Sequence, residues 1–424
     1  MDEIKFAKKI KEAGGEVYLV GGCVRDRLLG KKPNDKDYLL CGIAESDFTE
    51  MFPRAVKVGK SFPVYLMYVG QKRCETAFAR TERKNGEGYT GFSVEYNPKI
   101  TVEEDLFRRD LTVNSMAYSV LDKKIIDPYG GRRDLKNRML RATSQHFSED
   151  PVRALRAARF AAQLDFSVSH KTLQMMTKCA AELAKEPKAR ILAELEKALA
   201  APRPSIFFRV LKQTKLLSAV FPNICALIGK TQPAEYHLEG DAFEHTMLVL
   251  DDVASQTDRT EVRFAALMHD IGKGRTADEM LPRHIGHEEK GVEIIQELAK
   301  SFEFSKKWRL AAEFAASEHM RPARLKQTAK IVDLLNALQK NPLGIDGFSA
   351  IVKADNHGEN AECLENAEKY LAAMEKVKAE DAPKKLKGQK IAEWIRQKQI
   401  EAVRQLTTKT SGSLTAAVNI YRAL

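Results

Sequence analysis

The stretch VYLVGGCVRDRLLGKKPNDKDYLL (residues 17–40) decides what kind of domain opens this chain. The apolar run VYLV predicts a buried strand, and Gly21 and Gly22 permit a tight turn with close backbone approach. CVRDRLLG predicts a short helix closed by Gly30. Because backbone N–H groups at a strand–glycine–helix turn attract phosphates, we expect Gly22 and the guanidinium of Arg25 to bind a triphosphate.

The same stretch ends in two carboxylates at the start of an apolar run, DKDYLL. The period of two in a strand places Asp35 and Asp37 on one face, about 7 Å apart, with Lys36 on the other. Neighbouring carboxylates repel unless a cation lies between them. We therefore expect Asp35 and Asp37 to be catalytic and to hold Mg²⁺, which would bridge a triphosphate and support in-line displacement. Glu75, in the apolar strand CETAFA, is a candidate third carboxylate.

Length and charge limit the number of domains and the classes of partner that the chain is expected to have. A chain of 424 residues predicts several compact domains. Its 69 Lys and Arg against 58 Asp and Glu leave a formal charge of +11, which favours a polyanionic partner such as nucleic acid. Charge alone leaves open an ordinary basic enzyme.

Cysteine usage and hydropathy indicate the compartment. The six cysteines are scattered without any CxxC, which argues against a disulfide framework and a zinc ribbon and favours a reducing cytoplasm. The opening MDEIKFAKKIKEAGG predicts a charged amphipathic helix, not a signal peptide. Because no run of 18 apolar residues occurs, we expect no membrane insertion.

The pattern of apolar residues changes near residue 137. Before it, short β-branched and aromatic runs alternate with glycine-containing turns, which predicts a mixed α/β domain. From Arg138 onward, apolar residues recur at spacings of three and four, which predicts helices. The segment KAEDAPKKLKGQK near residue 378 predicts an exposed linker before a last helix.

Further motifs follow the opening stretch in order: ARTERKNGEGYTGF (79–92), EEDLFRRDLTVNSMAYS (103–119), IIDPYGGRRDLKNRMLR (125–141) and SEDPVRALRAARFAA (148–162). Together with GGCVRDRLLGKKPNDKD they resemble the class II nucleotidyltransferases, which include tRNA CCA-adding enzymes and bacterial poly(A) polymerases. The resemblance implies an α+β fold, in which a polymerase-beta-like head with a mixed sheet precedes an elongated all-α neck, body and tail. We expect segments 1–137 (head), 138–228 (neck and body), 229–360 (HD domain) and 361–424 (helical tail).

The resemblance also implies nucleotide contacts in the motif RRDLTVN. Arg109 and Asp110 resemble the pair that meets the phosphates and the ribose, and Asp110 could accept a hydrogen bond from a 2′-OH. Gly130 and Gly131 could form either a hinge or a plain turn between head and helices.

The motif SEDPVRALRAARF predicts a helix start with Ser148 as cap and Pro151 in the first turn. In the family that it resembles, EDxxR reads the incoming base. Cytosine and adenine both present an amino donor beside an unprotonated ring nitrogen, so a carboxylate at Asp150 and a guanidinium at Arg153 complement either base. Uracil and guanine present the reverse and are refused. We expect the last nucleotide-binding residues on this helix to be Arg156 and Arg159.

A second constellation lies in the helical arm and resembles an HD-type metal phosphohydrolase domain. Its expected ligands are His245, His269, Asp270, His287, His319 and Asp355. Neutral imidazoles and a shared carboxylate suit a divalent transition metal such as Ni, Co or Mn, which would activate water against a phosphoester, including a 2′,3′-cyclic phosphodiester. Where relatives have a further His-Asp, this chain has His319-Met320, which weakens that ligand position.

The resemblance spans nearly all 424 residues and implies a CCA tRNA nucleotidyltransferase that uses CTP, ATP and the tRNA 3′ end, as a monomer or homodimer. A poly(A) polymerase is the first alternative, although VGKSFPVY (58–65) has Ser61 where a second basic residue is expected. A partial CC- or A-adding enzyme is the second, although the loop in ARTERKNGEGYTGF is present. A non-polymerising RNA phosphatase is the third.

Overall fold

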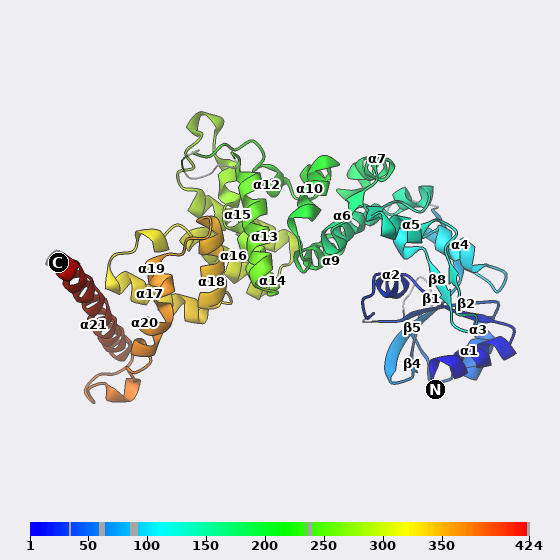
Figure 1. The fold of residues 1–424 in the computed structure, drawn as a ribbon, viewed down its shortest axis with the longest axis horizontal. Coiled ribbons are helices and arrows are strands. Elements are labelled where there is room, and N and C mark those ends of the chain that lie inside the picture. Colours follow the sequence, from blue (N-terminus) through cyan, green and yellow to red (C-terminus); the bar gives the residue numbers. More distant parts are fainter. Residues whose placement is uncertain (34, 59–63, 85–91, 234, 236–239, 422–424) are drawn as a thin grey trace. The chain divides into compact units, whose positions relative to one another are not determined.

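The computed structural model describes residues 1–33, 35–58, 64–84, 92–233, 235 and 240–421. The chain divides into two compact units, Met1–Pro222 and Asn223–Leu424, and each is described by itself (Figure 1).

The first unit contains a mixed sheet. Among the described residues it has seven strands in the order β3-β4-β5-β2-β1-β8-β9. Its strands are β1 (Glu16–Val20), β2 (Asp37–Cys41), β3 (Val56–Val58), β4 (Val64–Val69), β5 (Lys72–Phe78), β8 (Ala117–Ser119) and β9 (Ile125–Ile126). The central pair β2 and β5 is parallel, whereas β1 pairs antiparallel with both β2 and β8. A separate antiparallel pair joins β6 (Arg80–Lys84) to β7 (Phe92–Tyr96).

Strand β2 is covered on both faces, which explains its continuous apolar run. On one face, the ring of Tyr38 packs edge-on against Phe6 of α1 (Glu3–Glu12) at 5.5 Å between centroids. On the other face, Leu39 joins a core cluster with Leu106 of α4 (Val102–Phe107). Because successive side chains of a strand point to opposite faces, Tyr38 and Leu39 pack into two different cores. This packing on both faces fixes the start of β2, where Asp37 lies.

Helices form most of the rest of the first unit. Its other helices and short strands are α2 (Gly22–Leu28), α3 (Glu45–Met51), η1 (Thr112–Asn114), α5 (Gly131–Lys136), β10 (Met139–Leu140), η2 (Gln145–Glu149), α6 (Val152–Leu164), β11 (Ser167–Val168), α7 (His170–Lys178), α8 (Ala180–Leu183), α9 (Lys188–Leu199), α10 (Ser205–Gln213) and α11 (Leu216–Val220). The short helix α12 (Pro222–Cys225) lies at the division between the units.

One local prediction fails at the start of the helical part. Helix α6 begins at Val152, so the prediction that Ser148 caps it is wrong: Ser148 lies inside the 3-10 turn η2. The cap is supplied instead by the Asp150 side chain, which accepts a hydrogen bond from the Val152 N–H at 3.1 Å. The helix ends at Asp165, which adopts a left-handed conformation with φ of 55°.

The glycine pair Gly130-Gly131 forms a packed turn. Gly130 has φ of 76° and begins α5. A Cβ at Gly131 would lie 2.3 Å from the Thr112 carbonyl oxygen, so only glycine allows this approach. Of the two alternatives, the geometry favours the turn over the hinge.

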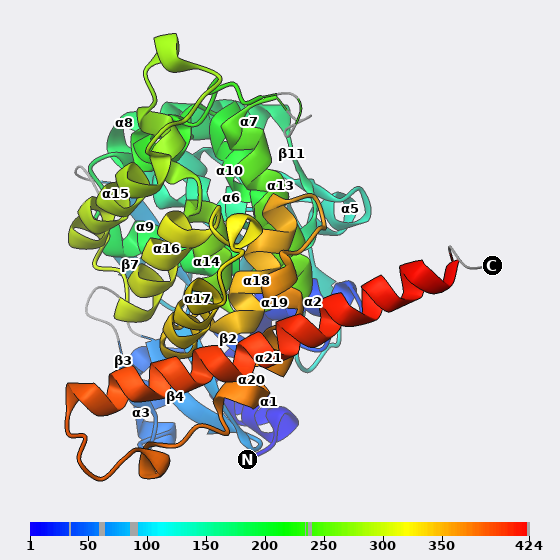
Figure 2. The same ribbon diagram turned by 90° about the vertical axis from the view of Figure 1, so that its left-hand side faces the viewer.

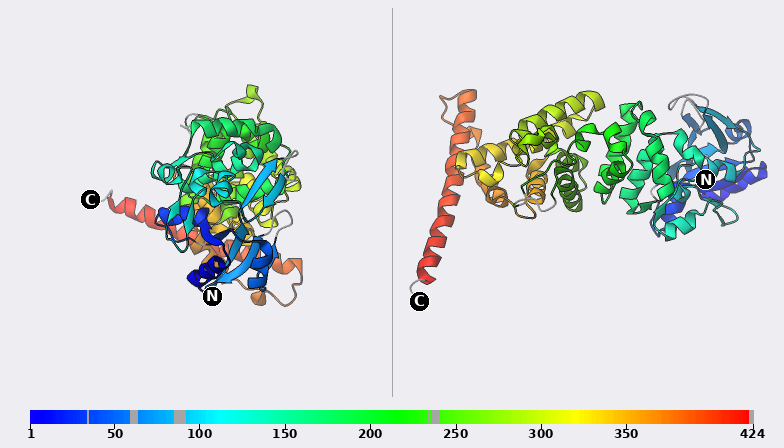
Figure 3. Two further views of the ribbon diagram at one scale, coloured as in Figure 1. Left: turned by 90° about the vertical axis from the view of Figure 1, so that its right-hand side faces the viewer. Right: turned by 90° about the horizontal axis from the view of Figure 1, so that it is seen from above.

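The described residues of the second unit form helices joined by turns and loops, with one isolated β-bridge between Thr231 and Asp241 (Figure 3). Its helices are α13 (Ala242–Gln256), α14 (Thr260–Met268), η3 (Ile271–Arg275), η4 (Asp278–Met280), α15 (His287–Phe302), α16 (Lys306–Glu318), η5 (Pro322–Arg324), α17 (Thr328–Lys340), α18 (Gly344–Asp355), α19 (Glu362–Glu365), α20 (Ala367–Met374), η6 (Ala379–Asp381) and α21 (Gln389–Tyr421). One core cluster runs from Val249 in α13 to Val403 in α21. Arg396 of α21 grips Asp333 of α17 through two hydrogen bonds of 2.7 and 2.9 Å, so the last helix packs on this core (Figure 2).

Cysteine pairing and helix hydropathy can be examined over the described residues. None of the six cysteines, all of which the structure describes, forms a disulfide. The helices of the described ranges include none that is both long and apolar enough to cross a membrane.

Candidate active site and metal centre

The first wall of the candidate active site is the glycine turn after β1. Gly21 has φ of 72°, and a Cβ there would lie 3.2 Å from the Arg109 guanidinium. Glycine therefore lets Arg109 approach the backbone that opens α2. Arg25 is buried and donates to Asn114 Oδ1 at 2.8 Å and to Asp26 Oδ1 at 2.9 Å. The turn thus carries two guanidinium groups at the position expected for a phosphate.

The second wall is a group of carboxylates at the start of β2. In the parallel register, Asp37 lies directly opposite Glu75 of β5. Burial raises the pKa of Asp37, and the charges of Glu75 and Asp35 raise it further, whereas Arg109 lowers it. Such crowding favours a bound cation. The prediction that Asp35 belongs to the strand is wrong, because β2 begins at Asp37 and Asp35 precedes it as an exposed residue.

These groups open into one cavity of about 880 Å³ within the first unit. Its lining includes every predicted nucleotide-binding residue but not Asp35, and these residues come from the sheet, from α2, from the turn between α4 and η1, and from the start and body of α6. The predicted residues among them are Gly22, Arg25, Asp37, Glu75, Arg109, Asp110, Asp150, Arg153, Arg156 and Arg159. The structure therefore brings together side chains that are more than 100 positions apart in the sequence.

The motif RRD contributes two side chains, Arg109 and Asp110, that are fixed by hydrogen bonds at the cavity wall. Arg109 makes a bidentate contact to the buried Asp105, at 3.1 and 2.9 Å. Asp110 accepts from the Leu111 N–H at 2.8 Å and from Arg156 Nε at 2.9 Å. Burial opposes ionisation of Asp110, but the charge of Arg156 prevails and lowers its pKa to about 2. Asp110 is thus a fixed, ionised acceptor at the cavity wall.

The two residues predicted to read the base are held by different neighbours. Asp150 pairs with Arg190 of α9, whose Nη2 lies 3.1 and 3.0 Å from its two carboxylate oxygens. Arg153 donates to the His146 carbonyl at 2.8 Å and approaches Glu82 at 3.5 Å. Although Asp150 and Arg153 are three residues apart, these two described side chains form ion pairs with Arg190 and Glu82 and not with each other.

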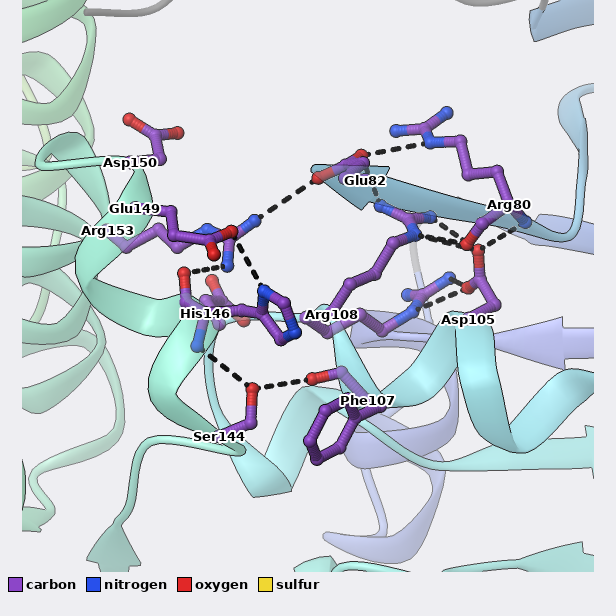
Figure 4. A network of polar contacts seen from close by, with 12 residues as sticks. Arg80, Glu82, Asp105, Phe107, Arg108, Ser144, His146, Glu149, Asp150 and Arg153 are labelled. Carbon is purple, nitrogen blue, oxygen red and sulfur yellow. Dashed lines mark hydrogen bonds and ion pairs between the residues drawn. The ribbon is translucent and has the colours of Figure 1, made fainter. Parts of the chain in front are cut away.

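Glu82 is the centre of a charged network that ties β6 to this site (Figure 4). Its carboxylate pairs with Arg108 at 2.7 Å, Arg80 at 3.0 Å and Arg153 at 3.5 Å. Burial lowers the pKa of Arg80 to about 10, and Arg108 lowers it too, because the guanidinium groups crowd together. Three arginines around one carboxylate leave a positive surplus beside the cavity, which suits a polyanionic ligand.

Arg156 and Arg159 complete the wall. Arg156 bridges Asp110 and Glu194, at 2.9 and 3.9 Å. Arg159 Nε lies 2.6 Å from Glu194, and its guanidinium stacks over Phe160 at 3.9 Å. Both arginines are therefore oriented by α9 and by their own helix.

In the second unit, helix ends bring the predicted metal ligands together. His269 and Asp270 follow α14, His287 begins α15 and His319 follows α16, while His245 lies in α13 and Asp355 ends α18. They form two groups that share one carboxylate. These groups are His245-His269-Asp270-Asp355 and Asp270-His287-His319, each with its ligand atoms within 4.8 Å of one another.

The chemistry of the donor atoms fits a metal. His269, His287 and His319 direct Nδ1 to backbone carbonyl oxygens at 2.7, 2.7 and 3.0 Å. Their Nε2 atoms face inward, and none of these has a hydrogen-bond partner among the described residues. Asp270 Oδ1 likewise has no hydrogen-bond partner among the described residues, whereas Oδ2 lies 2.6 Å from Lys273 Nζ, with which it forms an ion pair. Buried polar atoms are rarely left without a hydrogen-bond partner. The absence of partners for several atoms that face one another therefore identifies these atoms as candidate metal ligands.

Electrostatics support the same assignment. Without a cation, burial opposes protonation of His269, but Asp270 and Asp355 raise its pKa to about 10. The pKa of Asp270 is held well below its usual range against burial, by Lys273 and then His269. Lys273 Nζ lies 2.6 Å from Asp270. The cluster therefore strongly favours positive charge at its centre.

Close packing of glycine sets the geometry of this cluster. A Cβ at Gly272 would lie 1.9 Å from the His287 carbonyl oxygen, so glycine lets α15 approach the turn after Asp270. His319 is buried and its Nε2 lies 3.4 Å from Asp270. Met320, at the position where an Asp was expected, therefore does not keep His319 out of the cluster.

Among the residues that contribute to the sites without having been predicted are Glu82, Arg190 and Lys273. Glu82 lies within a quoted motif, and its place between basic residues was an available signal. Arg190 and Lys273 pair with Asp150 and Asp270 respectively, and only the fold brings Arg190 to its partner. Two observations used to separate the alternatives lie outside the described residues: Ser61, which spoke against a poly(A) polymerase, and residues 85–91 of the loop in ARTERKNGEGYTGF, which spoke against a partial enzyme.

Comparison with protein families follows the same division. The family "Poly A polymerase head domain" matches residues 17–141. "Probable RNA and SrmB- binding site of polymerase A" matches residues 165–228, and the HD domain matches 242–379. The head and the HD domain are thus both identified independently of the geometry.

Solved structures have the same fold. A structure described as a tRNA-processing enzyme with CTP is 25% identical, with a TM-score of 0.60 over 93% of this chain and 98% of its own. The Bacillus stearothermophilus CCA-adding enzyme in complex with CTP is 22% identical, with a TM-score of 0.63 over 97% of this chain and 93% of its own. These likenesses confirm the expected fold class.

Curated relatives extend over most of the sequence. The Multifunctional CCA protein of Haemophilus influenzae is 44% identical over 315 residues, which is 72% of this chain and 74% of that protein. The Multifunctional CCA protein of Nitrosococcus oceani is 40% identical over 405 residues, which is 92% of this chain and 98% of that protein. With its head, its RNA-binding segment and its HD domain in the same order, this chain belongs to the family of multifunctional CCA proteins.

Proposed function

We propose that this chain is a CCA tRNA nucleotidyltransferase, which adds and repairs the 3′-terminal CCA of tRNA from CTP and ATP without a nucleic-acid template. One observation carries the proposal: a single cavity holds the carboxylates Asp37 and Glu75 on one wall and the residues Asp150 and Arg153 on another. A nucleotide in this cavity would have its phosphates near the carboxylates and its base near α6.

The transfer step requires a nucleophile, a leaving group and charge compensation. The 3′-hydroxyl oxygen of the tRNA attacks the α-phosphorus, loses its proton and displaces pyrophosphate. Asp37 and Asp35, with Glu75 as a further candidate, would hold Mg²⁺, which supplies charge compensation for the attacking and leaving oxygens. Arg109 and Arg25 lie at the glycine turn, where they would bind the phosphates.

Base selection follows from hydrogen-bond geometry. The Asp150 carboxylate accepts from the exocyclic amino group of cytosine or adenine, and Arg153 donates to the adjacent ring nitrogen. Uracil and guanine would leave polar groups unpaired. Asp110, kept ionised by Arg156, would accept the ribose 2′-OH, while Arg156 and Arg159 orient this wall.

For the second unit we propose a metal-dependent phosphohydrolase, active on phosphomonoesters or 2′,3′-cyclic phosphodiesters. His245, His269, Asp270 and Asp355 would hold one ion, and Asp270, His287 and His319 would hold another. Imidazole nitrogens together with a shared carboxylate suit a divalent transition metal, for which we propose Ni, Co or Mn, and such an ion would lower the pKa of a bound water. The buried, inward Nε2 atoms are the supporting observation.

The remaining assignments are part of the same proposal. The four segments 1–137, 138–228, 229–360 and 361–424 are the proposed head, neck and body, HD domain and tail. We propose a monomer or homodimer in the cytoplasm, consistent with six cysteines that form no disulfide.

The test supplies the chain with tRNA that lacks its end and with each labelled nucleotide separately. We expect C addition to tRNA lacking CCA, A addition to tRNA ending in CC, and no use of UTP or GTP. Repeated A addition would identify a poly(A) polymerase, addition of only C or only A would identify a partial enzyme, and hydrolysis without addition would identify a phosphatase. Each of these results would contradict the proposal.

A further inference from the structure

The carboxylate predicted to read the amino group of the base is held by a second helix. Asp150 precedes α6, yet both of its oxygens are contacted by Nη2 of Arg190, a residue of α9, at 3.1 and 3.0 Å. Oδ1 also accepts the Val152 N–H at 3.1 Å. A carboxylate has about four acceptor positions. The contacts therefore leave acceptor capacity on Oδ2, with the orientation of the group already set.

Arg190 is itself held in place. Its Nη1 donates to the buried Glu186 at 2.7 Å, so that its guanidinium lies between two carboxylates. The side chains of Arg190 and Asp150 are 25% and 21% exposed, and both line the cavity. Because this pair is partly shielded from water and fixed on two sides, it is stronger than a surface ion pair.

The other base-reading residue has separate supports. Arg153 is held by the His146 carbonyl and by Glu82, and neither belongs to α9. A change at Arg190 should thus disturb the acceptor that reads the amino group without directly disturbing the donor that reads the ring nitrogen.

We propose that Arg190 is a positioning residue for base selection, which sets the Asp150 carboxylate as the acceptor for the exocyclic amino group. The inference rests on the proposed function, since it assumes that Asp150 reads the base. On this proposal, base selection depends on Arg190 of α9 as well as on the motif at the start of α6. Arg190 makes no contact with the nucleotide in this proposal and acts through Asp150.

The test uses a nucleotide that lacks only the group in question. Purine riboside triphosphate keeps the ring nitrogen of ATP but has no exocyclic amino group. We measure kcat/KM for ATP and for this analogue with the full chain and tRNA ending in CC. The variants are Arg190→Met, Arg190→Lys, Asp150→Ala and the double variant Asp150→Ala/Arg190→Met.

Arg203→Met is the matched control. Arg203 belongs to the same unit but forms an exposed pair with Asp165 at 3.4 Å and does not line the cavity. Its preference for ATP over the analogue should equal that of the wild type. The KM for tRNA should be unchanged in all variants, which a general loss of structure would not allow.

We expect Arg190→Met to reduce the preference for ATP over the analogue about tenfold, the scale of one hydrogen bond to a charged group. Arg190→Lys should fall between Met and wild type, because it keeps the charge without the planar fork, and it carries the test if the Met variant does not fold. The double variant should match Asp150→Ala alone.

The outcomes separate the two proposals. If Asp150→Ala loses the preference while both Arg190 variants keep it, the inference about Arg190 is overturned and the proposed function stands. If the double variant loses more than Asp150→Ala, Arg190 acts on the nucleotide directly and is not a positioning residue. If Asp150→Ala keeps the wild-type preference, the proposed base reading fails first.

Discussion

The nucleotide cavity and the histidine–aspartate cluster differ in whether their polar side chains have partners within the protein. In the cavity, Asp110, Asp150 and Glu82 are each paired with an arginine of the protein. In the cluster, the inward Nε2 atoms of His269, His287 and His319 have no hydrogen-bond partner among the described residues. One site is held together by its own ion pairs, whereas the other lacks partners that a metal would supply.

This difference reflects what each site binds. A nucleotide enters and leaves in every cycle, so its pocket must keep its shape in between, and internal ion pairs provide that shape. A resident metal remains, so its ligands need no substitute partners, provided that their Nδ1 atoms are anchored to the backbone. Mutations should therefore separate the two sites cleanly.

The largest effect is expected at the carboxylates of the head. Asp37→Ala and Asp35→Ala should each lower nucleotide addition about a thousandfold, because charge on the reacting phosphate would lose its compensation. Binding of tRNA, measured by filter retention, should stay near wild type. Asp47→Ala, at an exposed position outside the cavity, is the control. Near-normal incorporation by either variant would contradict the proposal that Asp35 and Asp37 hold the Mg²⁺ needed for transfer.

The second effect concerns metal retention in the other site. Asp270→Ala and His269→Ala should lower transition-metal affinity by more than about a hundredfold, since even outer partners of ligands contribute up to that much. Phosphoester hydrolysis should disappear while CCA addition is retained, as metal analysis and both assays would measure. His170→Ala, an exposed histidine of the first unit, should change neither. If the wild type binds no metal and hydrolyses nothing, this site is a structural remnant.

A smaller effect is expected from the base-reading pair. Asp150→Ala or Arg153→Ala should raise UTP and GTP use by about 10- to 100-fold relative to CTP and ATP, as each bidentate contact contributes roughly 1–3 kcal/mol. Single-nucleotide incorporation with tRNA lacking CCA measures this ratio. CTP and ATP should be affected together. A variant that loses only ATP selection would show that the bases are read at separate places.

The smallest effect is a pH-dependent stability at Asp110. Its pKa lies at about 2, below its ordinary 3.8, so ionisation is favoured by folding. The stabilisation of about 2 kcal/mol is present above pH 4 and is lost as the pH falls toward 2. Asp110→Asn should thus lower Tm by about 5 °C at pH 7, and by progressively less below pH 4 in calorimetry. A difference that does not change with pH would contradict the pairing with Arg156.

The sequence was most informative where chemistry is local. The glycine turn at Gly21, the apolar run of β2 and the helical period after residue 138 depend on neighbouring residues, and each predicted element is present. The errors also have local causes. Asp35 lies just before the strand, and Ser148 lies in a 3-10 turn, because element ends are set by packing and by competing caps such as Asp150.

The sequence by itself determined the α+β head, the helical remainder and the residue types of both sites, because hydrophobic period and motif spacing are properties of the chain. Only the tertiary structure decided the partners. It placed Arg190 on Asp150, Glu82 among three arginines and the inward nitrogens of the histidines around Asp270. Such pairs join residues tens of positions apart, and their energies depend on burial and distance, which no local pattern specifies.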